Sequence, residues 1–155
     1  MRGQRFHTRD AKATARAALA QRKVAEHKLD GWRVRYGSAR SVVGSCDYAS
    51  KTIRISRMYL WSDETSDESF LDTVLHEIAH ALVGPGKGHG PEWKAAAASV
   101  GCSGQRLADT EHLPHRYHVT CPCGEVDEKR HRVDRIRKAR MACKKCKGEL
   151  AIRGL

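Results

Sequence analysis

Three histidines and two glutamates lie within a single stretch, HEIAHALVGPGKGHGPEW, which runs from residue 76 to residue 93. On a helix, His76 and His80 are separated by about 6 Å along the axis and about 40° around it, so both imidazoles can meet one zinc ion. Glu77 lies about 100° round from His76, where it can reach a water that the metal holds and take its proton. The spacing therefore predicts metal-assisted hydrolysis of a carbonyl compound.

A catalytic zinc site needs a third protein ligand and one open position. The glycines that alternate through residues 84–90 give the backbone freedom to double back after the helix. His89 then arrives just before Pro91, a residue that suits the first position of a new helix. We expect His89 to be the third ligand, with Glu92 and Glu111 as its rivals.

The residues before the motif predict the helix that carries it. Thr65 to Glu68 has the spacing of a capping box, Ser66 and Asp67 are alternative caps, and acidic residues crowd the first turn. Gly84-Pro85 ends the pattern. Apolar residues recur between these limits at three- and four-residue intervals, at Phe70, Leu71, Val74, Leu75, Ile78 and Leu82.

Further elements are expected on either side of this helix. An alanine-rich helix is predicted over 8–29, capped by Thr8 or Asp10 and stopped by Asp30-Gly31. PEWKAAAASV predicts a short helix that starts at Pro91. Three segments rich in β-branched and aromatic residues predict a small antiparallel sheet with one wet face, at 32–36, 41–46 and 51–56.

Four of the six cysteines form two close pairs, Cys121-Pro-Cys123 and Cys143-x-x-Cys146. The start, MRGQRFHTRD, is polar and basic, and no apolar run reaches the length of about eighteen residues that would span a membrane. We therefore expect a soluble cytoplasmic protein, associated with the nucleoid if it binds DNA or located in the host cytoplasm if viral. In a reducing compartment the cysteine spacing favours a four-thiolate zinc ribbon over disulfides.

The formal net charge of +11 is unevenly spread. Residues 1–23 carry seven Lys and Arg against Asp10, and residues 129–147 carry ten against Asp134, whereas residues 63–92 carry seven acids against Lys87. Basic flanks indicate a polyanionic partner, with ordinary solvated faces as the alternative.

The densest basic set lies between the cysteine pairs and predicts contacts to nucleic-acid phosphates. No Phe, Tyr or Trp follows Tyr117, so bases would find no stacking platform there and sequence preference should be weak. The set consists of Arg130, Arg132, Arg135, Arg137, Lys138 and Arg140.

HEIAHAL, the glycine-rich loop, HGPEW and the downstream CxC and CxxC pairs resemble the SprT-like zinc metallopeptidases, which are related to the Spartan protease domain. The resemblance extends from about Trp32 to Leu150, including DGWRVRY and the Gly44-Ser-Cys46 region. The step from His80 to His89 is longer than that of metzincins.

The resemblance implies His76, His80 and His89 as ligands of a catalytic zinc and Glu77 as the catalytic base. It also implies an α+β fold, with a zincin-like metallopeptidase domain at 1–116, whose helical segment is 1–31, and a zinc ribbon at 117–155. The implied function is zinc-dependent cleavage of proteins attached to or near DNA, with one catalytic and one structural zinc.

The alternative is a nucleic-acid-binding zinc-ribbon protein whose HEIAH site is vestigial. Glu77 favours the peptidase, because a site that only binds zinc needs no carboxylate beside its ligands. The oxyanion-stabilising group stays open among three residues, His112, His115 and Tyr117. We expect Trp93 to pack in the core beneath the zinc loop. Cys46 and Cys102 are expected to be buried as small apolar side chains.

Overall fold

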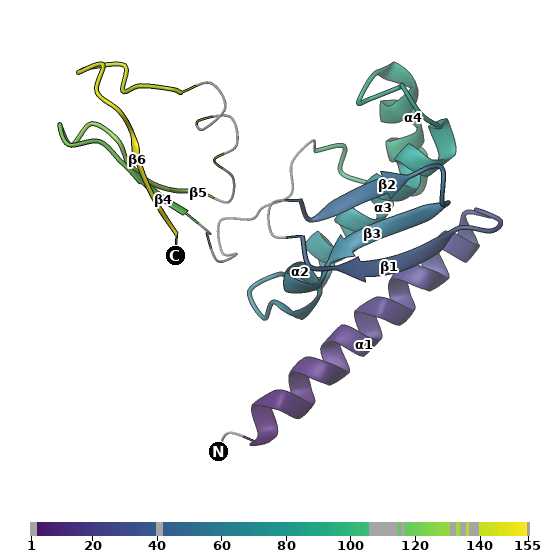
Figure 1. Ribbon diagram of the computed structural model, residues 1–155. Coiled ribbons are helices and arrows are strands. Elements are labelled where there is room, and N and C mark those ends of the chain that lie inside the picture. Colours follow the sequence, from purple (N-terminus) through teal and green to yellow (C-terminus); the bar gives the residue numbers. More distant parts are fainter. Residues whose placement is uncertain are drawn as a thin grey trace. The chain divides into compact units, whose positions relative to one another are not determined.

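The computed structural model describes residues 3–39, 42–105, 115, 117–130, 133, 136 and 140–154, with the backbone alone for residues 3–9 (Figure 1). The chain forms two compact units, residues 1–112 and 113–155, and both are built around small sheets. The first unit contains α1 (Gly3–Glu26), β1 (Arg33–Gly37), β2 (Gly44–Asp47), β3 (Thr52–Ser56), α2 (Arg57–Trp61), α3 (Asp67–Val83) and α4 (Pro91–Val100). The second contains β4 (Tyr117–Thr120), β5 (Asp127–Arg130) and β6 (Ala151–Gly154). The expected α+β class is confirmed.

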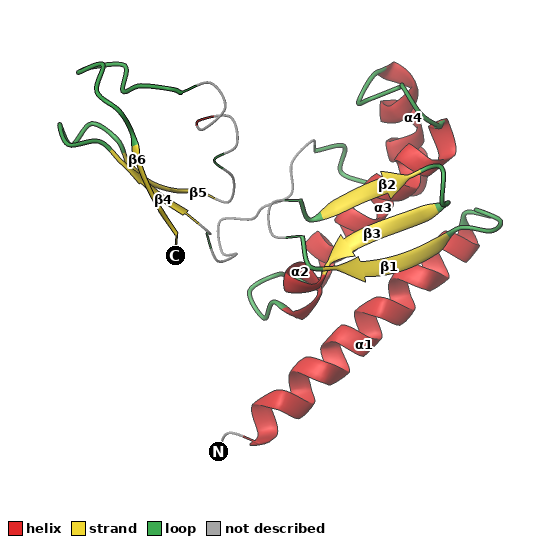
Figure 2. Ribbon diagram, in the orientation of Figure 1, coloured by secondary structure: helices red, strands yellow, loops and turns green. Residues whose placement is uncertain are grey.

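The sheet of the first unit is mixed, so the expectation of an antiparallel sheet was wrong. Its strand order is β1-β3-β2, with β1 parallel to β3 and β2 antiparallel to it (Figure 2). Ile53 and Ile55 make β3 the most apolar of the three strands, and both side chains are buried. A strand whose side chains are buried is favoured at the centre of the sheet. Between β1 and β3, residues 38–51, which include β2, are long enough to make the crossover that a parallel pair needs.

Helices cover one face of this sheet. The helix α3 packs against β2 and β3, α1 packs against β1 and α3, and α4 packs against α3 (Figure 1). The opposite face exposes the arginines of β1 and β3, Arg33, Arg35 and Arg54, which is the wet face that the alternation predicts.

The ends of the helices differ from the sequence predictions. The helix α1 begins at Gly3, so Thr8 and Asp10 lie inside it instead of capping it. The cap of α3 is Ser66, one of the alternatives to Thr65, since its side chain accepts a hydrogen bond from the Ser69 amide at 3.1 Å. The short helix α2 was not predicted, because RMYLW is too short for a helical period to show.

Arg16 joins three helices of the first unit. Only 2% of this side chain is exposed, although it projects from α1 into the loop between α2 and α3. It donates to Asp67 Oδ1 at 2.8 Å and lies 5.3 Å from the ring centre of Phe70. It also donates to the backbone carbonyls of Leu60 in α2 (3.0 Å) and of Ser62 (3.1 Å) and Thr65 in the loop. The guanidinium fork thus satisfies carbonyls that no secondary structure pairs.

The second unit contains a three-stranded antiparallel sheet in the order β5-β4-β6. Its small core contains Val119, Val133 and Ile136, with Tyr117 and Ile152 among the side chains packed around them. This sheet brings the segments that carry the two cysteine pairs to one place. None of the helices in the described part of the chain is long and apolar enough to cross a membrane.

We predict that Arg16→Lys lowers the free energy of unfolding by about 2 kcal/mol or more, because an ammonium cannot reach the same acceptors and leaves buried carbonyls unpaired. Urea unfolding of the full chain measures this. Arg22→Lys is the matched control on the same helix, where the side chain is 65% exposed, and should change stability by less than about 0.5 kcal/mol. Equal effects of the two substitutions would contradict the role given to Arg16.

Candidate active site and metal centres

The structure brings His76, His80 and His89 together. The first two project from α3, one helical turn apart. The helix is capped by Gly84, whose φ is positive (81°) and whose amide donates a hydrogen bond to the carbonyl of His80 at 3.1 Å. At this glycine the chain leaves the direction of the helix. The loop then presents His89 immediately before Gly90, which caps α4.

Three imidazole Nε2 atoms converge on one point. The His76–His89 pair is 3.0 Å apart, and the His76–His80 and His80–His89 pairs are each 3.2 Å apart. Tetrahedral coordination with zinc–nitrogen bonds of about 2.0–2.1 Å requires nitrogens about 3.3–3.4 Å apart. The triangle is therefore close to the face of a tetrahedron, and the three residues can hold a metal ion with one position left for another ligand.

Two of the three histidines, His76 and His80, favour the neutral form that binds metal. Burial lowers the pKa of His80 to about 4, and the neighbouring His76 and His89 contribute to this shift by repulsion. Burial and His89 also lower the pKa of His76. Neutral imidazoles with facing lone pairs repel one another unless a cation lies between them, so the arrangement suits a metal ion.

Trp93, the third residue of α4, forms the floor of the histidine group. Only 1% of it is exposed, and its ring centre is 4.5 Å from that of His89, 4.6 Å from that of His76 and 5.3 Å from that of His80. The expectation that Trp93 packs beneath the loop is confirmed. Because one rigid ring contacts all three imidazoles, it limits how far each of them can rotate.

Glu77 lies on the side of α3 that faces the sheet and is only 6% exposed. Its neighbour there is Gly44 of β2: a Cβ at this glycine would be 2.6 Å from Glu77 Oε1 and 3.0 Å from its Cγ. Glycine therefore makes the room in which the carboxylate lies. Burial raises the pKa of Glu77 to about 7, and the positive charge of a bound metal ion would favour the ionised form.

Two other residues of the β2 region adjoin Glu77. Cys46 is half-buried instead of buried, and burial followed by the nearby Glu77 charge raises the pKa of its thiol to about 12. The Tyr48 hydroxyl donates to the carbonyl of His80 at 3.3 Å, and its ring meets that of Trp32 edge to face. Cys102 is buried, as predicted.

The remaining candidates for the third ligand and the oxyanion group are Glu92, Glu111, His112, His115 and Tyr117. Glu92 is exposed in the first turn of α4, where it pairs with Lys87 at 3.0 Å, and it does not join the histidine group. Tyr117 packs in the core of the second unit, and His115 belongs to the same unit. Glu111 and His112 fall outside the described residues.

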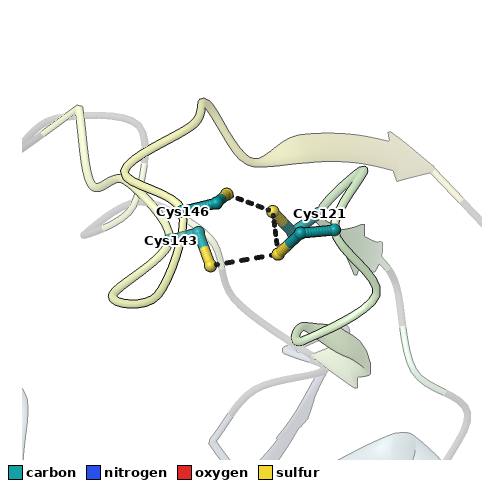
Figure 3. A group of neighbouring side chains, drawn as sticks. Cys121, Cys143 and Cys146 are labelled. Carbon is teal, nitrogen blue, oxygen red and sulfur yellow. Dashed lines mark hydrogen bonds between the residues drawn. The ribbon is translucent and has the colours of Figure 1, made fainter.

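The four paired cysteines form a second candidate metal centre. Cys121 Sγ is 3.2 Å from that of Cys123 and 3.3 Å from that of Cys146, while the Cys123 and Cys143 sulfurs are 3.7 Å apart (Figure 3). A tetrahedral zinc with bonds of about 2.3 Å to sulfur requires sulfurs about 3.8 Å apart. The donor set therefore fits one structural metal ion.

Each cysteine pair lies in a tight turn. In the second turn backbone amides donate hydrogen bonds to sulfur, and in the first a backbone hydrogen bond closes the turn. Backbone amides of Cys146 and Lys145 lower the pKa of the Cys143 thiol to about 6, which favours the thiolate that a metal needs. The amide of Gly148 donates to Cys146 Sγ at 3.4 Å. Gly124, with a φ of 74°, closes the first turn.

Of the six basic residues predicted to contact phosphates, two are described. Arg130 is exposed at the end of β5 and pairs with Glu128, and Arg140 is exposed at a positive φ of 44°. The other four lie outside the described residues, namely Arg132, Arg135, Arg137 and Lys138.

Two groups of side chains among the described residues can each bind a metal ion: three imidazoles in the first unit, with a buried carboxylate next in sequence to one of them, and four thiols in the second unit. The chain matches the SprT-like family over residues 12–118 and belongs to it. Membership suggests a metallopeptidase-like function. The search of curated proteins and that of solved structures gave no match.

We predict that Glu77→Gln stabilises the metal-free protein more at pH 8 than at pH 5. The folded-state pKa of Glu77, about 7, is above the ordinary value of 4.5, so the wild type loses stability as pH rises from 4.5 to about 7, where the unfolded chain releases a proton that the folded chain still holds. Glutamine does not titrate, so the difference in unfolding free energy should grow by up to about 3 kcal/mol over this range. Thermal unfolding at both pH values measures it.

Glu68→Gln, an exposed position on the same helix, is the control and should show no such pH dependence. A difference for Glu77→Gln that stays constant or shrinks with rising pH would show that the carboxylate is solvated in the folded state.

Proposed function

We propose that the protein is a zinc-dependent endopeptidase of SprT type with a zincin-like catalytic domain, and that it acts on proteins attached to or near DNA. In this proposal His76, His80 and His89 hold the catalytic zinc and Glu77 is the general base. The paired cysteines Cys121, Cys123, Cys143 and Cys146 hold a structural zinc.

The observation that carries the proposal is the placement of Glu77 relative to the histidine triad. A purely structural metal site is closed and gains nothing from a buried carboxylate next to a ligand. Here α3 turns the histidines toward α4 and Glu77 toward β2, and Gly44 leaves space for it. Burial of a carboxylate with a pKa near neutrality costs stability, and such positions are typical of groups that transfer protons.

When bound, zinc would supply a Lewis acid that polarises a peptide carbonyl and acidifies water. The chain's own residues supply the rest. The Glu77 carboxylate takes the proton of the attacking water and returns it to the amine that leaves, and a pKa near 7 suits both transfers. The three imidazoles keep their Nε2 lone pairs for the metal, and Trp93 keeps their rings in place.

The sheet offers a way to orient a substrate. The strand β2 is at one edge, it carries Gly44, and its outer side has no partner strand among the described residues. An extended segment of a protein can add to such an edge through backbone hydrogen bonds. This favours unfolded or flexible segments as substrates over compact domains.

The alternative function, nucleic-acid binding with a vestigial HEIAH site, is less well supported. It explains the basic residues around the cysteine cluster but gives no reason for a buried Glu77 or for the tetrahedral spacing of the imidazoles. DNA association in our proposal is a property of the ribbon that brings the peptidase to its substrates, through phosphate contacts with little sequence preference.

We predict that Glu77→Gln abolishes cleavage while both zinc ions are retained, because the substitution removes only the proton acceptor. The assay measures degradation of a protein crosslinked to DNA, and of casein, with and without single- and double-stranded DNA. Metal analysis of each variant accompanies it. Glu68→Gln is the control and should cleave like the wild type.

An absence of cleavage by the wild type under all these conditions, with two zinc ions bound, would overturn the peptidase proposal. It would leave the nucleic-acid-binding alternative.

We predict that neutralising the six basic residues predicted to contact phosphates weakens the salt dependence of DNA binding. The slope of log binding constant against log salt concentration should fall in magnitude by about 0.9 for each phosphate that the protein no longer neutralises. The variant replaces Arg130, Arg132, Arg135, Arg137, Lys138 and Arg140 by glutamine. The control removes the same charge from exposed cations of the first unit, Lys28, Arg33, Arg35, Lys51, Arg54 and Arg57. Equal slopes for the ribbon variant and the wild type would exclude the ribbon from DNA binding.

A further inference from the structure

A single carboxylate of α3, that of Asp72, holds the segment that follows α4. Asp72 Oδ1 accepts the Ser103 amide at 2.6 Å, and Oδ2 accepts the Ser103 hydroxyl at 2.7 Å. The buried Cys102 thiol adds a long contact, 3.8 Å, to the backbone carbonyl of Asp72. Ser103 is thus fixed at two atoms, although its side chain is exposed.

The same serine positions the next residues. Its Oγ accepts the amide of Gln105 at 3.2 Å, so it forms a local turn across Gly104. Gly104 has a φ of 75°, a conformation that favours glycine. The carboxylate of Asp72 therefore determines, through Ser103, where the backbone of Gln105 lies.

Gln105 in turn contacts a metal ligand. Its backbone is hydrogen-bonded to the ring of His76, an interaction that raises the pKa of His76 against the stronger lowering by burial. The amide of Gln105 already donates to Ser103 Oγ, so the backbone group left for the ring is the carbonyl, which accepts while the ring donates. Because Nε2 of His76 faces the other two histidines, the nitrogen that donates to Gln105 is Nδ1.

Asp72 and His76 are four residues apart on α3, so they lie on one side of the helix, one turn apart. A chain of contacts also joins them: the Asp72 carboxylate binds Ser103, Ser103 binds the amide of Gln105, and the carbonyl of Gln105 accepts from the ring of His76. We propose that Asp72 and Ser103 are positioning residues for the metal ligand His76. They hold residues 102–105 against α3 so that the carbonyl of Gln105 fixes the Nδ1–H tautomer and leaves Nε2 for the metal.

This inference rests on the metal-binding part of the proposed function and does not depend on peptidase activity. Residues 103–105 are exposed, so apolar packing contributes little to holding them. Without the carboxylate the turn can leave the helix, and His76 is then free to rotate or to take the other tautomer.

The test uses the full-length protein with its metal bound and labelled with ¹⁵N at histidine. In the wild type we expect a slowly exchanging Nδ1–H proton on His76 in NMR spectra. Asp72→Ala and Ser103→Ala should both lose this signal. In competition with a chelator, both should release the zinc of the histidine site with an affinity about 10–100-fold lower. The His80→Ala variant identifies which released zinc belongs to that site.

Two further variants make the result specific. Asp72→Asn keeps the shape and the acceptor for the Ser103 amide, so it should retain more of the Nδ1–H signal than Asp72→Ala does. Ser99→Ala is the matched control for Ser103→Ala, because the Ser99 hydroxyl donates to the carbonyl of Ala96 within α4 and does not reach the turn at residues 103–105. It should behave like the wild type.

An unchanged Nδ1–H signal and unchanged zinc affinity in Asp72→Ala and Ser103→Ala would overturn the inference and leave Asp72 as a plain loop anchor. If Asp72→Ala fails to fold, Ser103→Ala and Asp72→Asn decide between the same outcomes. A wild type that binds no zinc at the histidines would instead contradict the proposed function. In that case, the Nδ1–H signal of His76 would still test the positioning.

Discussion

Three imidazole nitrogens with facing lone pairs, 3.0–3.2 Å apart, are the interaction on which the first unit depends. Without a cation between them the arrangement is repulsive, so the surrounding structure must hold it in place. Two of the histidines lie on α3, whose inner side is buried, the third is returned by the turn after Gly84, and Trp93 contacts all three rings. The packing of α3 and α4 thus holds the candidate metal site in shape.

The same helix has to satisfy a second, opposing requirement. Glu77 lies on the side of α3 that faces β2, where burial disfavours its charge. A glycine on the strand makes this possible, and any larger side chain at Gly44 would displace the carboxylate. The stability that burial of Glu77 costs is offset elsewhere, for instance by Arg16, which pairs the carbonyls that link α2 to α3.

Much of the fold was predictable because it depends on local patterns. Period and composition predicted α1, α3, α4 and three strands, and Pro91 marked the start of α4. Strand direction was predicted wrongly, since apolar and polar residues alternate in the same way in parallel and antiparallel strands. The strand order follows from β3, which pairs with β1 along one edge and with β2 along the other. Leu82 continues the apolar period of α3, yet it is 44% exposed, so the period alone does not predict burial at the end of the helix.

The sequence by itself determined which residues can bind a metal, because the four-residue step of a helix and the close spacing of cysteines are local properties of the chain. It also indicated His89, through the glycines that reverse the backbone. Only the tertiary structure decided what surrounds these groups: Gly44 beside Glu77, Trp93 beneath the imidazoles, and the link from Asp72 through Ser103 to His76. Such contacts join residues far apart in the chain, and no spacing or period in the sequence records them.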